Sequence, residues 1–160
     1  MRAVITILMT MALLQTAQAD ELHVVLNGKA IHLQNRNYNE DNWGLGINYD
    51  FAARNNWINF LNASFFKDSN NQTSKYAGGG TKRRYLLDSK DTDGWHIDAG
   101  IIGFLMTRED YKENQPFFGA LPFVAVGKSW FTVNATYIPA MTPKHTSLFF
   151  FQAMVRVAEF

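Results

Sequence analysis

The sequence predicts an all-β fold, an eight-stranded antiparallel transmembrane β-barrel, and three observations support this prediction. Apolar and polar residues alternate in runs of roughly ten residues, which is the period of strands. The connections between the runs alternate between short turns and, for the most part, longer polar loops. All 4 tryptophans lie at the ends of runs, where a membrane barrel carries its aromatic girdle.

The composition limits the class of protein. The chain has 160 residues, of which 47% are apolar and only 18% are charged, so we expect one folded domain and no disordered chain. With 15 Lys and Arg against 14 Asp and Glu, the formal charge of +1 argues against a nucleic-acid partner. The lack of cysteine excludes disulfides and thiol catalysis, and 4 scattered histidines without an i,i+4 pair predict no metal site.

Residues 1–19 are predicted to form a secretory signal peptide that precedes a barrel domain over residues 20–160. Arg2 provides a positive charge, Ala3 to Leu14 an apolar stretch, and Ala17-Gln18-Ala19 a cleavage site of small residues. The alternative is an N-terminal membrane anchor, but about twelve apolar residues are fewer than the ~20 that span a bilayer. We therefore expect cleavage after Ala19 and export from the cytosol.

Two runs alternate strictly, Trp43 to Phe51 and Phe131 to Tyr137. Each places large apolar side chains on one face and small or polar ones on the other. Six less regular runs, rich in aromatic and β-branched residues, complete the predicted set: Leu22 to Leu33, Trp57 to Lys67, Thr73 to Leu87, Trp95 to Thr107, Phe117 to Gly127 and Leu148 to Phe160.

A soluble barrel of the lipocalin sort is the structural alternative, because alternation alone is common to both classes. A narrow barrel has little room inside, so the large apolar faces of the two strict runs point outward, which favours the membrane barrel. The run Phe117 to Gly127 is apolar on both faces. Such a lumen wall suits an acyl chain better than a water-filled pore.

One set of residues carries the elements of acyl-transfer chemistry. His32 ends the first run and Asp68-Ser69 follows the third, and counting strands up and down brings both to the end with the longer loops. An imidazole, a carboxylate that can orient it and a nearby hydroxyl are the parts needed to activate an attacking hydroxyl near neutral pH. The alternative is a rim histidine beside an Asp-Ser turn.

The sequence around these residues resembles the lipid A palmitoyltransferase family (PagP type). Ala63-Ser64-Phe65-Phe66-Lys67-Asp68-Ser69 is similar to that family's strand ending in Phe-Lys-Asp-Ser. Ile31-His32, followed by Tyr38-Asn39-Glu40 and then Trp43-Gly44, resembles its first loop. The stretch from Leu121-Pro122-Phe123 to Thr136-Tyr137-Ile138-Pro139 is similar to its paired-proline region.

The resemblance implies roles for six residues. His32, Asp68 and Ser69 match the family's catalytic residues, and Gly80 aligns with the glycine that forms the floor of the acyl-chain pocket. Pro122 and Pro139 match prolines that open a lateral path for lipid, since proline cannot donate to a β-ladder.

The activity implied is transfer of an acyl chain, with palmitoyl expected, from a phospholipid donor to lipid A in a Gram-negative outer membrane. An exchange of one ester for another needs no cofactor and no metal. Two alternatives remain open: a lipid A or phospholipid hydrolase on the same barrel, and a noncatalytic outer-membrane barrel. The terminal Phe160 resembles the signature that the outer-membrane assembly machinery reads, and it is compatible with all three.

Overall fold

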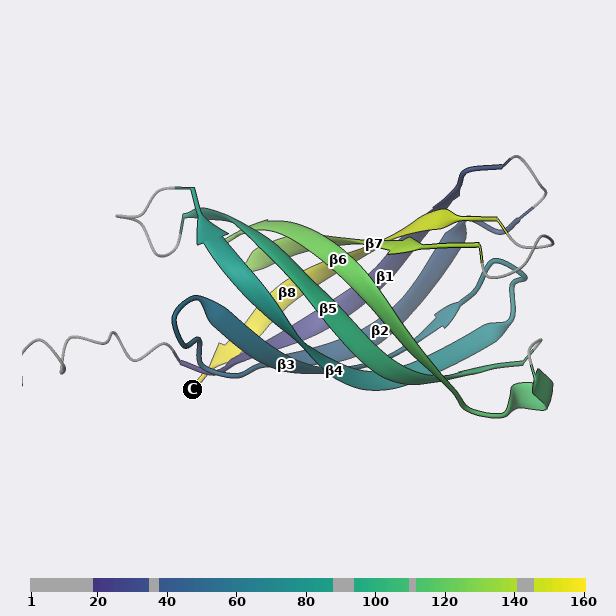
Figure 1. The fold of residues 1–160 in the computed structure, drawn as a ribbon, viewed down its shortest axis with the longest axis horizontal. Coiled ribbons are helices and arrows are strands. Elements are labelled where there is room, and N and C mark those ends of the chain that lie inside the picture. The colour runs from purple at the N-terminus through teal and green to yellow at the C-terminus, as the bar shows by residue number, and fades with distance from the viewer. Residues whose placement is uncertain (1–18, 35–37, 88–93, 110–111, 141–145) are drawn as a thin grey trace, which may run out of the picture.

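The computed structural model is a closed barrel of eight antiparallel strands, as predicted (Figure 1). It describes residues 19–34, 38–87, 94–109, 112–140 and 146–160, so residues 1–18 of the expected signal peptide lie outside the described residues. No helix in the described ranges is long and apolar enough to cross a bilayer. The elements are β1 (Glu21–His32), β2 (Asp41–Asp50), β3 (Trp57–Lys67), β4 (Thr73–Leu86), β5 (Trp95–Arg108), the 3-10 turn η1 (Lys112–Asn114), β6 (Phe117–Lys128), β7 (Phe131–Ile138) and β8 (Leu148–Glu159).

The predicted runs agree with these strands to within two residues at every end. Each strand pairs with the next along the chain, and β8 returns to pair with β1 and close the barrel. The backbone N–H of Phe160 donates to the carbonyl of Asp20 (2.9 Å) beside this closing seam. Hydrogen bonds from the Tyr49 hydroxyl (2.5 Å) and the Ala52 N–H (2.6 Å) hold the pKa of Asp20 below its ordinary value.

The connections alternate between the two ends of the barrel, but the β4–β5 connection is not the short turn that the sequence predicted. The β2–β3, β4–β5 and β6–β7 connections lie at the end that holds the C-terminus, and the other four lie at the opposite end (Figure 1). We call these the inner and outer ends. Left-handed backbone at Asn55 (φ 53°), Asn56 (φ 65°) and Ser129 (φ 49°) forms tight turns at the inner end, and Asn tolerates this conformation well.

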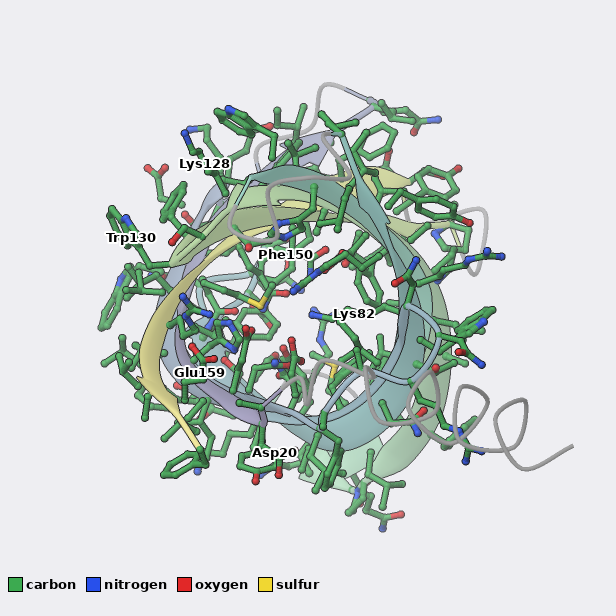
Figure 2. All side chains as sticks on the ribbon, turned by 90° about the vertical axis from the view of Figure 1, so that its left-hand side faces the viewer. Asp20, Lys82, Lys128, Trp130, Phe150 and Glu159 are labelled. Carbon is green, nitrogen blue, oxygen red and sulfur yellow. The ribbon has the colours of Figure 1, made fainter. Side chains whose placement is uncertain are left out.

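Large apolar side chains on β2 point away from the barrel interior. Trp43, Leu45 and Ile47 are 65%, 47% and 59% exposed, whereas Asn48 and Asp50 are buried inside. Figure 2 shows the same division, with Lys82 and Phe150 inside the ring of strands and Trp130 outside. The predicted outward direction of the apolar face is confirmed, and it is the reverse of a soluble barrel, which turns its polar face to water.

Strand β6 contributes apolar side chains to both faces. Phe118 and Val124 are exposed on the outside, while Phe123 and Ala125 are buried inside. Residue Leu121 lines the interior cavity together with Phe123. The apolar lumen wall that the sequence predicted is therefore present.

Candidate functional site

His32 and Ser69 meet at the outer end of the barrel. His32 is the last residue of β1, and its Nε2 lies 2.9 Å from Ser69 Oγ, which is hydrogen-bond distance. The His32 side chain is only 3% exposed. The ring of Tyr38 stacks on the imidazole, with centroids 4.4 Å apart and planes 17° from parallel. The imidazole is thus held with one nitrogen directed at a hydroxyl.

The other imidazole nitrogen faces a carboxylate from the β1–β2 connection. Within the described part of the chain, His32 Nδ1 is buried and has no hydrogen-bond partner. Glu40 Oε1 lies 3.7 Å from this nitrogen and 3.5 Å from the His32 backbone nitrogen. Sequence reasoning gave Glu40 no role beyond its place in the family resemblance, because the sequence does not show how the connection folds back over β1.

The Asp68 carboxylate is turned into the β3–β4 connection instead of toward His32. Asp68 is 3% exposed. Its carboxylate accepts hydrogen bonds from the backbone N–H groups of Asn70 (2.9 Å) and Gln72 (3.0 Å) and from the Ser74 hydroxyl (3.0 Å). It also forms an ion pair with the Arg108 guanidinium (3.1 Å). A carboxylate in this position caps a turn. The turn that it organises carries Ser69.

Asn39 ties the β1–β2 connection to the same turn. Its backbone N–H donates to the carbonyl of Ser69 (2.9 Å), and its side-chain amide donates to the carbonyl of Asp68 (3.0 Å). The residues on either side of Asn39, Tyr38 and Glu40, both lie beside the imidazole. The two segments are therefore one bonded unit around His32.

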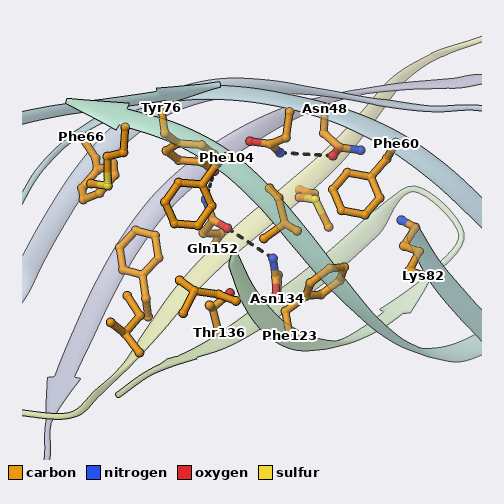
Figure 3. A pocket seen from close by; sticks show the side chains of 17 residues that line it. Asn48, Phe60, Phe66, Tyr76, Lys82, Phe104, Phe123, Asn134, Thr136 and Gln152 are labelled. Carbon is orange, nitrogen blue, oxygen red and sulfur yellow. Dashed lines mark hydrogen bonds between the residues drawn. The ribbon is translucent and has the colours of Figure 1, made fainter. Parts of the chain in front are cut away.

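An apolar cavity occupies the lumen between this unit and the middle of the barrel (Figure 3). Aromatic side chains from five strands form much of its wall: Phe60, Phe66, Tyr76, Phe104, Phe123 and Phe150. The cavity is narrow and dominated by apolar side chains, which suits a hydrocarbon chain better than a polar solute.

A chain of polar side chains crosses one wall of the cavity. The Gln152 amide donates to Asn27 Oδ1 (2.7 Å) and to the Tyr76 hydroxyl (3.1 Å), and Asn134 donates to Gln152 (3.2 Å; Figure 3). Asn27 in turn donates to Ser64 Oγ (2.6 Å). These bonds connect β7, β8, β1, β3 and β4 through the interior, so they fix the register of a barrel that has little apolar core.

Charged side chains close the inner end of the cavity. Lys82 Nζ lies 2.6 Å from Asp50 Oδ2 and 3.4 Å from Asp98 Oδ2, and Arg84 makes two 3.0 Å hydrogen bonds to Asp98. Lys82 and both aspartates are at most 3% exposed. Lys82 stands at one limit of the cavity in Figure 3. We call Asp50, Lys82, Arg84 and Asp98 the charged floor.

Gly80 lies just above the charged floor, two residues before Lys82 on the same face of β4. A Cβ at this position would overlap the backbone carbonyl oxygen of Ile101 on β5 and would lie 2.7 Å from Phe60 Cζ. Phe60 is itself part of the cavity wall. A side chain at position 80 would therefore displace Phe60 within the cavity wall and press on the backbone of β5.

The ladder between β6 and β7 ends well before the outer end of the barrel. Its outermost pair is Phe123 with Thr136. Pro122 is the next residue of β6 toward the outer end, and it has no partner in this ladder. On the other side, Pro139 comes immediately after β7. Leu121 and Ile138, just beyond the last pair, line the cavity. The end of the ladder thus lies beside the cavity wall, and we call this place the β6–β7 seam.

Comparison with known proteins places this geometry in a family. The model of the family described as "Antimicrobial peptide resistance and lipid A acylation protein PagP" matches residues 15–153. The chain belongs to this family. The match confirms the resemblance drawn from the sequence, and it covers seven of the eight strands in full.

The relatives found by sequence carry one name. A "Lipid A acyltransferase PagP" of Laribacter hongkongensis is 34% identical over 103 residues, covering 64% of this chain and 47% of that protein. The proteins of the same name from Methylobacillus flagellatus and Legionella pneumophila are 30% and 35% identical, over 71% and 65% of this chain and 59% and 53% of theirs. The chain thus spans about half the length of these curated relatives.

Solved structures with a similar outline include Ail, the attachment invasion locus protein of Yersinia pestis. Its complex with the heparin analogue sucrose octasulfate gives a TM-score of 0.48 at 8% identity, covering 89% of this chain and 100% of that chain. A second Ail structure gives a TM-score of 0.46 at 10% identity over the same shares of the two chains.

Proposed function

We propose that the protein is an outer-membrane acyltransferase that moves an acyl chain, palmitoyl by expectation, from a phospholipid to lipid A. The observation that carries this proposal is the His32–Ser69 pair, held at hydrogen-bond distance at the outer end of a barrel with an apolar cavity. Relatives 30–35% identical are named lipid A acyltransferases, which supports the acceptor.

The outward apolar faces support the membrane location. All 4 tryptophans are exposed, as expected for residues at the membrane interface. Export through a signal peptide over residues 1–19, a barrel domain over residues 20–160 and recognition of Phe160 by the assembly machinery complete this part of the proposal. The outer end, with His32, would then face the outer leaflet, where lipid A resides.

The chemistry proposed is an ester exchange. His32 takes the proton of the attacking hydroxyl, whose oxygen forms a new C–O bond to the donor's acyl carbon. The donor's ester C–O bond breaks, and the lysophospholipid oxygen leaves with the proton returned by His32. If Ser69 attacks first, the same pair of proton transfers occurs twice: the lysophospholipid leaves in the first round, and Ser69 Oγ leaves and regains its proton when the lipid A hydroxyl takes the acyl chain. Asp68 contributes by holding the turn that presents Ser69.

The decisive experiment is mass spectrometry of lipid A from a strain that has no lipid A acyltransferase of its own and expresses this protein. A mass gain of one acyl chain, with loss of one chain from phospholipid, supports the transferase. If lipid A is unchanged while free fatty acid and lysophospholipid rise, the protein is a hydrolase. If a folded barrel in the membrane changes no lipid, it is noncatalytic.

Lateral entry of the donor through the β6–β7 seam is part of this proposal, and it predicts that closing the seam blocks transfer. In register beyond Phe123–Thr136, the next pair would be Pro122 and Tyr137. The chain has no cysteine of its own, so a Pro122→Cys/Tyr137→Cys protein gives a single possible disulfide. We expect its oxidation to lower the rate of acyl transfer by about tenfold or more, and reduction to restore it.

The matched control for the seam is Val126→Cys/Val133→Cys, a pair that faces outward within the intact ladder. Its disulfide should leave the rate unchanged. Rates are compared before and after oxidation in each protein, with cross-linking followed by mass spectrometry. If the fully cross-linked seam protein transfers acyl chains as fast as its reduced form, lipid enters elsewhere.

Gly80→Met is expected to shift the preference to shorter acyl chains, by roughly two to four methylenes, because a close-packed lumen cannot absorb the added side chain. The new side chain would press on Phe60 at the inner end of the cavity. The measurement is competition among phosphatidylcholines of different chain length, read from the mass of the acylated lipid A. Gly103→Ala, whose Cβ would have no contact closer than 3.6 Å, is the control. An unchanged preference would remove Gly80 from the pocket floor.

A further inference from the structure

We infer that Glu40 is the positioning residue that orients the His32 imidazole, a role that the sequence assigned to Asp68. This inference rests on the proposed function, because it concerns the base in that reaction. It begins from two facts already described: His32 Nδ1 is buried without a hydrogen-bond partner among the described residues, and Glu40 Oε1 is the carboxylate oxygen 3.7 Å away.

The Glu40 backbone is fixed while its side chain retains room to move. The Ala30 N–H donates to the Glu40 carbonyl (2.9 Å), which continues the β1–β2 pairing to this residue. Asn39 anchors the preceding residue to the turn with Ser69. The Glu40 side chain is 42% exposed. A small rotation would bring Oε1 from 3.7 Å to about 3 Å, the length of a hydrogen bond.

Such shortening is common when a substrate closes a site, because catalytic hydrogen bonds are often long in structures without a ligand. Here, lipid at the outer end would cover the half-exposed carboxylate and remove water from it. A buried nitrogen without a partner is costly, so the bond to Glu40 becomes more favourable as water is excluded.

The consequence for the chemistry is a fixed tautomer. If Nδ1 carries its proton toward Glu40, Nε2 has a free lone pair, and Nε2 is the nitrogen that lies 2.9 Å from Ser69 Oγ. The imidazole can then accept a proton on the side where the hydroxyl lies, and the carboxylate stabilises the imidazolium that forms. Tyr38, stacked on the ring, limits rotation out of this orientation.

The position of Asp68 supports the same assignment. Its carboxylate is satisfied by two backbone N–H groups, a hydroxyl and the Arg108 guanidinium. Bringing it to His32 would break these four contacts, and Asp68 itself is buried, so the loss would be costly. Asp68 therefore acts on the site through the shape of the turn, and Glu40 through the imidazole.

The test compares Glu40→Gln and Glu40→Asp with the control Asp41→Asn. Asp41 is the next acid along the chain, and its carboxylate pairs with Lys29 at the surface. Acyl transfer from dipalmitoylphosphatidylcholine to purified lipid A is measured in detergent micelles. We expect Glu40→Gln to lower kcat roughly 10- to 100-fold with little change in KM. Glu40→Asp should recover part of this loss, and Asp41→Asn should behave like the parent protein.

A second readout does not depend on activity. In protein labelled with ¹⁵N-histidine, the Nδ1 and Nε2 chemical shifts of His32 report which nitrogen carries the proton. With dipalmitoylphosphatidylcholine bound, we expect the parent protein to hold the Nδ1–H tautomer and Glu40→Gln to lose this preference. Unchanged His32 shifts, or a Glu40→Gln kcat within twofold of the parent value, would overturn the inference. If the parent protein transfers no acyl chain, the proposed function fails, and the shifts alone decide the role of Glu40.

Discussion

His32→Ala is expected to lower the rate of acyl transfer by about 10²- to 10⁴-fold, which is the usual contribution of a general base. The loss should appear in kcat, because the apolar cavity that would bind the acyl chain is untouched. Initial rates of purified protein in micelles, with phosphatidylcholine and lipid A as substrates, give the measurement. The variant should retain the circular dichroism of a folded barrel.

The matched control is His23→Ala, a buried histidine near the inner end of the same strand. Its removal leaves the outer end intact, so the rate per folded molecule should stay close to that of the parent. Equal losses in the two variants would mean that His32 acts through folding. A His32→Ala protein with full activity would exclude it as the base.

Asp68→Asn tests a different expectation from the sequence. If Asp68 organises the turn, its substitution weakens the pairing with Arg108 and the hydrogen bonds to the turn, and it displaces Ser69.

The sequence gives the order of residues along a strand but not the direction of a side chain after the strand ends. Asp68 is the first residue beyond β3, where the two-residue alternation stops, and so its direction followed only from the folded turn.

The strands themselves were predictable because large apolar residues alternate with small or polar residues at neighbouring positions in the sequence. In β2, the large residues point out and Asn48 and Asp50 point in, as the pattern indicated. Contacts between strands that are far apart in the sequence were not predictable in this way. Gln152 donates to Asn27 across 125 residues, and such a pair depends on how β8 registers with β1 when the barrel closes. The contact between Glu40 and His32 was not predictable for another reason, because it depends on how the β1–β2 connection folds back over β1.

The partners of Lys82 in the charged floor were also not predictable from the sequence, and replacing Lys82 is expected to lower the stability of the barrel strongly. Lys82 follows a run of glycines that has only a faint likeness to a phosphate loop, and nothing near it in the sequence indicates a partner. The structure pairs it with Asp50 and Asp98 from two other strands.

Lys82→Met leaves the Asp50 carboxylate buried without its cation, while Asp98 keeps Arg84. Breaking a buried ion pair in this way costs about 3–5 kcal/mol of unfolding free energy.

Equilibrium unfolding in urea, with the barrel refolded into lipid vesicles, measures this loss for Lys82→Met and for the control Lys75→Met, an exposed lysine of the same strand. The control should lie within about 0.5 kcal/mol of the parent protein. Adding Asp50→Asn to Lys82→Met should recover part of the stability, because the neutral amide is cheaper to bury than an unpaired carboxylate. Additive losses in the double variant would show that the two side chains are not coupled. Recovery would instead show that the charged floor is stabilised by the pairing of its charges. In that case Met at position 82 lowers the stability mainly because it leaves the Asp50 carboxylate unpaired, and it lowers the stability less once Asn replaces Asp50.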